Sequence, residues 1–148
     1  MQRFVPNHLR QRPADTAVDL VLLLLQAEGE FSYLLARLGK SDDLGATEAA
    51  ALLALSRGPA PISGVARIVG IRPNGASVLV DRLYARGLVA RERNSSDNRV
   101  VSVALTEAGE AVAKRLEQHA EASIEDRLAG LTAAEREQLP ILLSRILS

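Results

Sequence analysis

Four side chains at helical spacing form the most informative surface that the sequence predicts. Asn74, Ser77, Val78 and Asp81 recur at i, i+3, i+4 and i+7, so on a helix they project from one face. An asparagine amide can make two hydrogen bonds to adenine, a serine hydroxyl can bond a base edge or a phosphate, and a valine can contact a thymine methyl. We call these four residues the recognition face, because their chemistry favours reading duplex DNA. The alternative is an ordinary amphipathic surface helix.

A helix from Arg72 to Arg86 is needed to carry this face. Pro73 suits the first helical position because its missing N–H would have no partner there, and Gly87 suits the C-terminal end. Gly75 costs roughly 1 kcal/mol relative to alanine inside a helix, so its presence suggests that a partner approaches closely. The opposite side carries an apolar stripe at helical period, which predicts burial: Ala76, Leu79, Val80 and Leu83.

A hairpin from Leu88 to Leu105 is expected directly after the helix. Its strand-like runs, 89–93 and 100–105, are rich in β-branched residues and flank a polar turn at 94–98. Arg91 and Arg93 alternate onto one side of the first strand, and Arg99 stands at the edge of the tip. A cationic loop of this shape can lie along a phosphate backbone or place an arginine in a minor groove. The alternative is a charged face that is only solvated.

The formal net charge is zero, which looks wrong for a DNA-binding protein until it is divided by position. Residues 57–99 carry eight Lys/Arg and three Asp/Glu. Residues 1–56 carry five and seven, and residues 100–148 carry five and eight. The positive charge is therefore concentrated on the predicted helix and hairpin, as nucleic-acid binding requires.

Two segments resemble the MarR family of bacterial winged helix-turn-helix regulators. They read RPNGASVLVDRLYARGLV from Arg72 and SDNRVVSVALTEAG from Ser96. The likeness covers the family's recognition helix, its Asp-x-Arg wing tip and its Leu-Thr-x-x-Gly start of the next helix, in order and at the family's spacing. It implies a mainly α fold with a small β-hairpin wing, built as a winged helix-turn-helix plus a helical dimerisation region.

The remaining chain fits a single domain over residues 1–148. We expect helices from Asp15 to about Leu38, from Thr47 to Arg57, from Pro61 to Val69, from Glu107 onward behind a Thr106 cap, and a last one opened by a Thr132–Glu135 capping box. Residues 1–45 and 106–148 would then form the helical dimerisation region. Residues 46–105 would form the winged helix-turn-helix DNA-binding module.

The first of these helices is apolar on almost every side. Leu20, Leu23 and Leu24 add to its stripe and leave little polar surface over two turns, so we expect it to be covered on more than one face. A subunit interface is favoured over a central core helix in one chain. Two further stripes support pairing of chains: Ala108, Val112, Leu116, Ala120, Ile124 and Leu128, and then Leu139, Leu142, Leu143 and Ile146. Pro140 is expected to kink the last helix.

The expected DNA-binding residues extend from the helix-turn-helix to the wing. Arg67, on its first helix, is expected near a phosphate. The full set is Arg67, Arg72, Pro73, Asn74, Gly75, Ser77, Val78, Arg82, Arg91, Arg93, Asn98 and Arg99. Asp81 suits this surface least, because an unpaired carboxylate repels phosphates. The resemblance implies that a wing arginine pairs with it, so we expect Asp81 to contact Arg99 or else Arg93, with Asp97 as a second structural brace. The alternative is a solvated aspartate.

Little in the sequence favours an enzyme. The absence of cysteine excludes disulfides and thiol-based redox sensing. His8 and His119 are far apart, and no zinc motif, P-loop or nucleophile elbow occurs, so we expect no catalytic residue, metal or cofactor. The longest apolar run, Leu20 to Leu25, is far shorter than the roughly 20 residues that span a bilayer. We therefore expect a cytoplasmic protein without a membrane partner.

We thus expect a sequence-specific transcriptional regulator, a repressor that binds a pseudo-palindromic double-stranded operator as a homodimer and is released by a small-molecule effector. The alternative is a winged helix that mediates protein–protein contact and does not bind DNA. The arginines around one polar helix face favour the first. The resembled family often has large aromatic residues where this chain has Ala49, Ala50 and Ala51, so a phenolic effector is less strongly implied.

Overall fold

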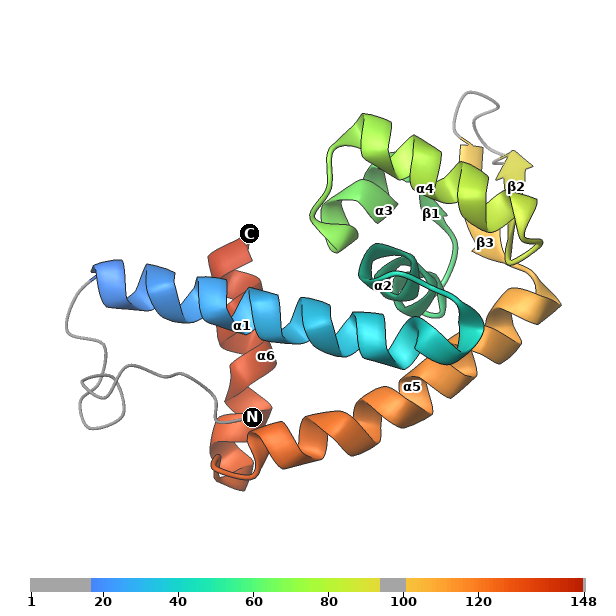
Figure 1. The fold of residues 1–148 in the computed structure, drawn as a ribbon. Helices are drawn as coiled ribbons and strands as arrows, with labels where there is room; N and C mark the ends of the chain where they lie inside the picture. Colours follow the sequence, from blue (N-terminus) through green and yellow to red (C-terminus); the bar gives the residue numbers. More distant parts are fainter. Residues whose placement is uncertain (1–16, 94–100, 148) are drawn as a thin grey trace.

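The computed structural model describes residues 17–93 and 101–147, with the Arg93 side chain excepted. Within these ranges the chain is mostly helical and carries one small antiparallel sheet (Figure 1), which confirms the expected fold class. In order, the elements are α1 (Ala17–Gly39), the 3-10 turn η2 (Lys40–Asp42), α2 (Ala46–Leu55), β1 (Ala60–Pro61), α3 (Ile62–Val69), α4 (Pro73–Ala85), β2 (Val89–Arg93), β3 (Val101–Leu105), α5 (Glu107–Leu128) and α6 (Ala133–Leu147).

The hydrophobic core is built around α2. Figure 1 shows α3 and α4 on one side of α2, with α1 and α5 on the other. Ala49, Ala51 and Leu52 on α2 are fully buried, since small side chains let the neighbouring helices approach closely. Each surrounding element contributes to the same cluster, for example Leu38, Val65, Leu83, Val103 and Leu116. This single core fixes the position of α4 relative to α5.

The helix-turn-helix consists of α3 and α4. Gly70 between them has φ of 74°, a left-handed conformation that glycine adopts without strain. Arg72 caps α4 and Pro73 is its first residue, while Gly87, with φ of 70°, follows its end. The predicted apolar stripe is buried in full: Ala76, Leu79, Val80 and Leu83. The expectations for this helix are confirmed.

The sheet contains one strand more than the sequence predicts. β2 and β3 pair antiparallel as expected, with Val89 opposite Leu105 and Arg91 opposite Val103. The two-residue β1 adds to the free edge of β3, with Ala60 opposite Val103. A two-residue strand containing proline has no alternating pattern by which a sequence reading could find it. The predicted wing tip at residues 94–98 lies outside the described residues.

The start of α5 is fixed by close packing. Thr106 Oγ1 accepts a hydrogen bond from the Gly109 N–H at 3.1 Å and donates one to the Gly87 carbonyl at 2.6 Å, which confirms the predicted cap. A Cβ on Gly109 would lie 1.9 Å from the Leu88 carbonyl oxygen. The predicted stripe is wrong at its first member, because Ala108 is exposed. The buried residues follow 3- and 4-residue steps instead: Gly109, Val112, Ala113 and Leu116.

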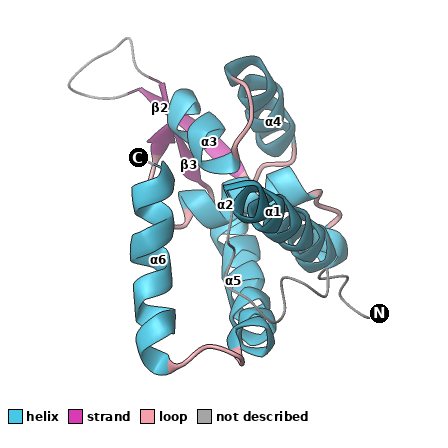
Figure 2. Cartoon of the chain, turned by 90° about the vertical axis from the view of Figure 1, so that its left-hand side faces the viewer, coloured by secondary structure: helices cyan, strands magenta, loops and turns pink. Residues whose placement is uncertain are grey.

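The two helices at the ends of the described chain expose much apolar surface. On α1 the exposed residues are Val18, Leu20, Val21, Leu22, Leu24 and Leu25, and on α6 they are Ile141, Leu142, Leu143, Ile146 and Leu147. Figure 2 shows α6 standing apart from the other helices, joined to the end of α5 by a loop. No described residue of α6 is buried. Even so, none of the described helices is long and apolar enough to cross a membrane.

The predicted capping box at the start of α6 is confirmed. The Thr132 N–H donates to Glu135 Oε2 at 2.8 Å, and the Glu135 N–H donates to Thr132 Oγ1 at 3.3 Å. The Thr132 hydroxyl also donates to Glu135 Oε2 at 2.9 Å. Together the backbone and hydroxyl bonds from Thr132 hold the pKa of the Glu135 carboxyl below its ordinary value of 4.5.

Candidate nucleic-acid interface

The recognition face of α4 is open to solvent. Asn74, Ser77, Val78 and Asp81 are all exposed, and half of the Val78 surface is accessible. The Ser77 hydroxyl donates to the Pro73 carbonyl at 3.3 Å, a long bond at the helix surface that leaves its oxygen able to accept another. The exposed Val78 side chain thus lies beside two hydrogen-bonding side chains, Asn74 and Ser77. A thymine methyl next to hydrogen-bonding base edges would complement this arrangement.

Gly75 lies on the same open surface. A Cβ at this position would meet only the Cδ1 atom of Ile71, at 3.9 Å, which is an ordinary contact. The chain's own packing therefore does not require glycine here, in contrast to Gly109. The missing side chain lowers the surface at the N-terminal end of α4, which favours close approach of a partner.

The helix-turn-helix that carries the recognition face also carries exposed arginines. Arg67 lies on α3, Arg72 at the cap of α4, and Arg82 near its C-terminal end, and each is exposed. They come from both helices of the helix-turn-helix. Guanidinium groups at such positions can bind phosphates on either side of a groove.

Asp81 pairs with Arg91, a wing arginine that the sequence analysis did not name as its partner. Arg91 Nη2 on β2 donates to Asp81 Oδ1 on α4, and the Arg91 guanidinium also lies over the ring of Tyr84, with Cζ 5.7 Å from the ring centroid. Arg91 is therefore an internal partner of α4 in this structure as well as a cation of the wing. Asp97, Asn98, Arg99 and the Arg93 side chain lie outside the described residues, so their expected roles stay predictions.

Tyr84 is a surface residue that the sequence reading missed. It lies seven residues after Ser77 and three after Asp81, so it extends the recognition face by one turn, and it is 56% exposed. Extending the i, i+3, i+7 pattern past Asp81 would have found it. Its position under Arg91 makes it part of the contact between α4 and the wing.

Arg86 holds the C-terminal end of α4 against the turn between α1 and α2. Its Nη1 donates to the Asp43 carbonyl at 2.7 Å and its Nη2 to the Asp42 carbonyl at 2.5 Å. The carboxylate of Asp42 in turn accepts from Arg115 Nη2 on α5 at 2.5 Å. We call these contacts the Asp42 junction. The sequence analysis assigned Arg86 no such contacts, since these partners are more than 40 residues away.

Solved structures with the same fold come from several organisms. A probable transcriptional regulator from Pseudomonas aeruginosa is 31% identical, with 91% of this chain and 99% of that one aligned and a TM-score of 0.69. A MarR family regulator from Silicibacter pomeroyi is 29% identical over 86% and 87% of the two chains, with a TM-score of 0.75. CouR from Rhodococcus jostii RHA1, solved bound to p-coumaroyl-CoA, is 25% identical over 87% and 92%, with a TM-score of 0.77.

Curated relatives from Bacillus subtilis match shorter stretches. The uncharacterized HTH-type transcriptional regulator YwhA is 24% identical over 89 residues, which is 60% of this chain and 64% of the relative. The HTH-type transcriptional repressor MdtR is 32% identical over 53 residues, 36% of this chain and 34% of the relative. The chain thus spans less than two thirds of the length of these two relatives.

An exposed helix face bordered by arginines, on a winged helix-turn-helix, defines a class of transcriptional regulators. A family model described as MarR family matches residues 42–99, which include η2's last residue, the helix-turn-helix and the first wing strand. The chain belongs to the MarR family of transcriptional regulators.

Proposed function

We propose that this regulator binds duplex DNA with the recognition face of α4 in the major groove and the wing along the adjacent backbone. The observation that carries the proposal is the division of α4 into two sides. Its apolar stripe is buried, while Asn74, Ser77 and Val78 stand in solvent. Such a helix is held rigidly by its core and offers its other side to a partner, as a reading helix must.

The proposed assembly is a homodimer in which 1–45 and 106–148 form the dimerisation region and 46–105 the DNA-binding module. The exposed apolar residues of α1 and α6 support this, because contiguous apolar surface of that kind marks an interaction site. Two copies related by a twofold axis would present two α4 helices to successive turns of the duplex. The operator would accordingly be pseudo-palindromic.

We further propose that the protein is a repressor released by a small effector. Support comes from two relatives, one named as a repressor and one solved with p-coumaroyl-CoA. An effector that binds one arrangement of the dimer better than another would shift the separation of the two α4 helices. Since half-site spacing on DNA is fixed, a change in that separation would lower operator affinity.

The test is a selection for tight-binding duplexes from a random library, followed by titration of the selected and a random duplex at several salt concentrations. We expect a palindromic consensus and an affinity that falls steeply with salt, since phosphate contacts release counterions. Arg72→Ala is expected to weaken binding to both duplexes, and Arg37→Ala, which removes an exposed cation of α1, to leave both unchanged. Absence of duplex binding at low salt would reject DNA recognition and favour the protein-interaction alternative.

A further inference from the structure

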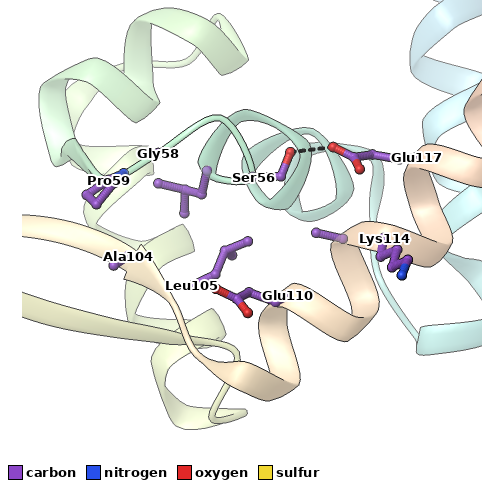
Figure 3. A pocket seen from close by; sticks show the side chains of 10 residues that line it. Ser56, Gly58, Pro59, Ala104, Leu105, Glu110, Lys114 and Glu117 are labelled. Carbon is purple, nitrogen blue, oxygen red and sulfur yellow. Dashed lines mark hydrogen bonds between the residues drawn. The ribbon is translucent and has the colours of Figure 1, made fainter.

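A pocket of about 420 Å³ opens between the C-terminal end of α2, the first half of α5 and the base of the wing (Figure 3). Four of its lining residues come from α5 at helical spacing, so one side of that helix forms a whole wall. The opposite walls are the Gly58–Pro59 connection and the end of β3. Its lining residues are Leu55, Ser56, Gly58, Pro59, Ala104, Leu105, Glu110, Ala113, Lys114 and Glu117.

The charged groups of this pocket leave it with an excess of negative charge. Its charged lining residues are two carboxylates, Glu110 and Glu117, and one ammonium, Lys114. The Ser56 hydroxyl donates to Glu117 Oε1 at 2.6 Å, which holds this carboxylate against the end of α2. Figure 3 shows the Glu110 carboxylate near Leu105, whereas the Lys114 side chain is directed away from both carboxylates. The Lys114 ammonium therefore does not lie between the Glu110 and Glu117 carboxylates.

The rest of the lining is apolar. Leu55, Pro59 and Leu105 contribute aliphatic surface to the lining, and Ala104 and Ala113 contribute small side chains. Concave, mostly apolar pockets of 300–1,000 Å³ with a few convergent polar groups are typical of small-ligand sites. We propose that this pocket binds a small organic cation, with a protonated amine paired to one of the two carboxylates, Glu110 or Glu117, and an apolar body on Leu55, Pro59 and Leu105.

The position of the pocket would allow a bound ligand to affect the wing. Its walls belong to α5, to β3 and to the segment that leads into β1, and β1 pairs with β3. An occupant would therefore contact α5, the central strand β3 and the segment that leads into the edge strand β1. If the proposed DNA-binding function holds, on which this consequence rests, the cation would act as an effector by changing the angle between wing and α5.

The first experiment measures binding without DNA. Three probes of equal shape are compared by isothermal titration and by methyl NMR: 4-phenylbutylammonium, neutral 4-phenylbutanol and anionic 4-phenylbutanoate. We expect saturable binding of the ammonium probe, roughly tenfold tighter than of the alcohol, the size of preference that two partly exposed carboxylates provide. The perturbed methyl groups are expected to be those of Leu55, Leu105 and Ala113. Equal binding of the three probes, or no saturable binding of the amine, would overturn the proposal.

The second experiment removes the charge without changing shape. The double variant E110Q/E117Q keeps an amide oxygen at residue 117 that can accept from Ser56, so we expect it to fold. Its preference for the ammonium probe over the alcohol is expected to disappear. Glu121→Gln removes an exposed carboxylate of the same helix outside the pocket and serves as the matched control. Circular dichroism checks that both variants are folded. The assignment of the site would be contradicted if Glu121→Gln lost the preference for the ammonium probe, or if folded E110Q/E117Q kept it.

The third experiment separates this site from the proposed function. The ammonium probe is added to wild-type protein and to E110Q/E117Q during duplex titration, and we expect a change in apparent duplex affinity only in the wild type. If the wild type binds no duplex, the DNA-binding proposal fails while the calorimetric result still decides the pocket. If it binds duplex and saturates with amine but affinity does not change, the pocket stands and its regulatory role is rejected.

Discussion

Arg91 on the first wing strand is bound to Asp81 on the recognition helix, and its guanidinium covers Tyr84 one turn further along. Both charged side chains are substantially exposed, at 39% and 63%, so the pair contributes at most about 1 kcal/mol to folding. We propose that its main consequence is geometric, because a contact between β2 and α4 restricts the direction of the wing relative to α4. Pairing also neutralises the one carboxylate on the recognition face that would repel phosphates.

We expect Asp81→Asn to lower operator affinity with little change in melting temperature. Removing the carboxylate relieves repulsion but frees the wing, and the second effect is expected to dominate. Arg91→Ala removes the same contact, so the double variant is expected to lose less than the sum of the two single losses. Duplex titration of all four proteins measures this. A higher affinity for Asp81→Asn, with discrimination between duplexes kept, would reject the role of the pair in holding the wing.

Asn74→Ala and Ser77→Ala are expected to reduce the preference for the operator by roughly 1–3 kcal/mol each, since they remove hydrogen bonds to base edges. Binding to a random duplex should be unchanged. Arg67→Ala is expected to weaken both complexes and to reduce the salt slope by about 1, as loss of one phosphate contact does. Parallel titrations at several salt concentrations compare the three variants. Similar behaviour of all three would show that reading and positioning are wrongly assigned.

The exposed apolar residues of α1 and α6 lead to a prediction about the oligomeric state. Wild-type protein at low micromolar concentration is expected to sediment at twice the chain mass, and Val21→Glu or Leu142→Glu to shift it towards the monomer, because each places a charge in the proposed interface. Ile68→Glu changes an equally exposed apolar residue of α3 and is expected to leave the mass unchanged. A wild-type monomer would contradict the dimer and, with it, the palindromic operator.

Gly109 and Gly130 provide a matched pair for stability. Gly109→Ala forces a methyl group towards the Leu88 carbonyl, 1.9 Å from the ideal Cβ position, and is expected to lower the free energy of unfolding by about 2–3 kcal/mol. Gly130→Ala meets nothing within 4 Å and is expected to stay within about 0.5 kcal/mol. Chemical denaturation monitored by circular dichroism gives both values. Equal stability of the two variants would show that α5 can shift away from Leu88.

The capping box at α6 predicts a dependence on pH. Because its hydrogen bonds lower the pKa of folded Glu135, the stabilisation that they provide is present above the ordinary carboxyl pKa and is lost as pH falls through the lowered value. Thr132→Ala is therefore expected to raise the Glu135 pKa and to destabilise α6 more at neutral pH than in strong acid, where only the bond from the Glu135 N–H to the Thr132 hydroxyl is lost. NMR titration of the Glu135 carboxyl checks the shift. An unchanged pKa in the variant would show that the Thr132 hydroxyl does not contribute to the lowering and that the Thr132 backbone N–H accounts for it.

The sequence predicts α4 well because its signals are local. A proline at the first position, a glycine after the end and a stripe at helical period lie within 16 residues, and together they determine the helix and its buried side. The Thr106 and Thr132 caps were predictable for the same reason, since each partner lies three residues away. The expectations for the recognition face likewise needed only the spacing of side chains along one helix.

The features that the sequence did not predict depend on contacts between distant segments. Arg91 reaches Asp81 because the hairpin folds back against α4, and spacing alone cannot rank Arg91 against Arg93 or Arg99. β1 exists because β3 offers a free edge, since its own two residues carry little strand signal. Ala108 is exposed because the buried side of α5 begins at Gly109. Glycine has no side chain, so it does not appear in an apolar stripe. The pocket combines four segments, and no single motif contains it.

The Asp42 junction also bears on how far the residues of the recognition face move when the DNA-binding module tilts. Arg86 ties the end of α4 to the turn at Asp42 and Asp43, and Arg115 ties the same turn to α5. If the DNA-binding module tilts about this point, Asn74, twelve residues up the helix, is the end of a lever about 18 Å long. A tilt of about 5° then displaces it by roughly 1.5 Å, half the length of a hydrogen bond. Groups close to the pivot hardly move, so under the proposed mode of DNA binding a small rotation would disrupt base contacts at Asn74 first and the backbone contacts proposed for Arg82 last.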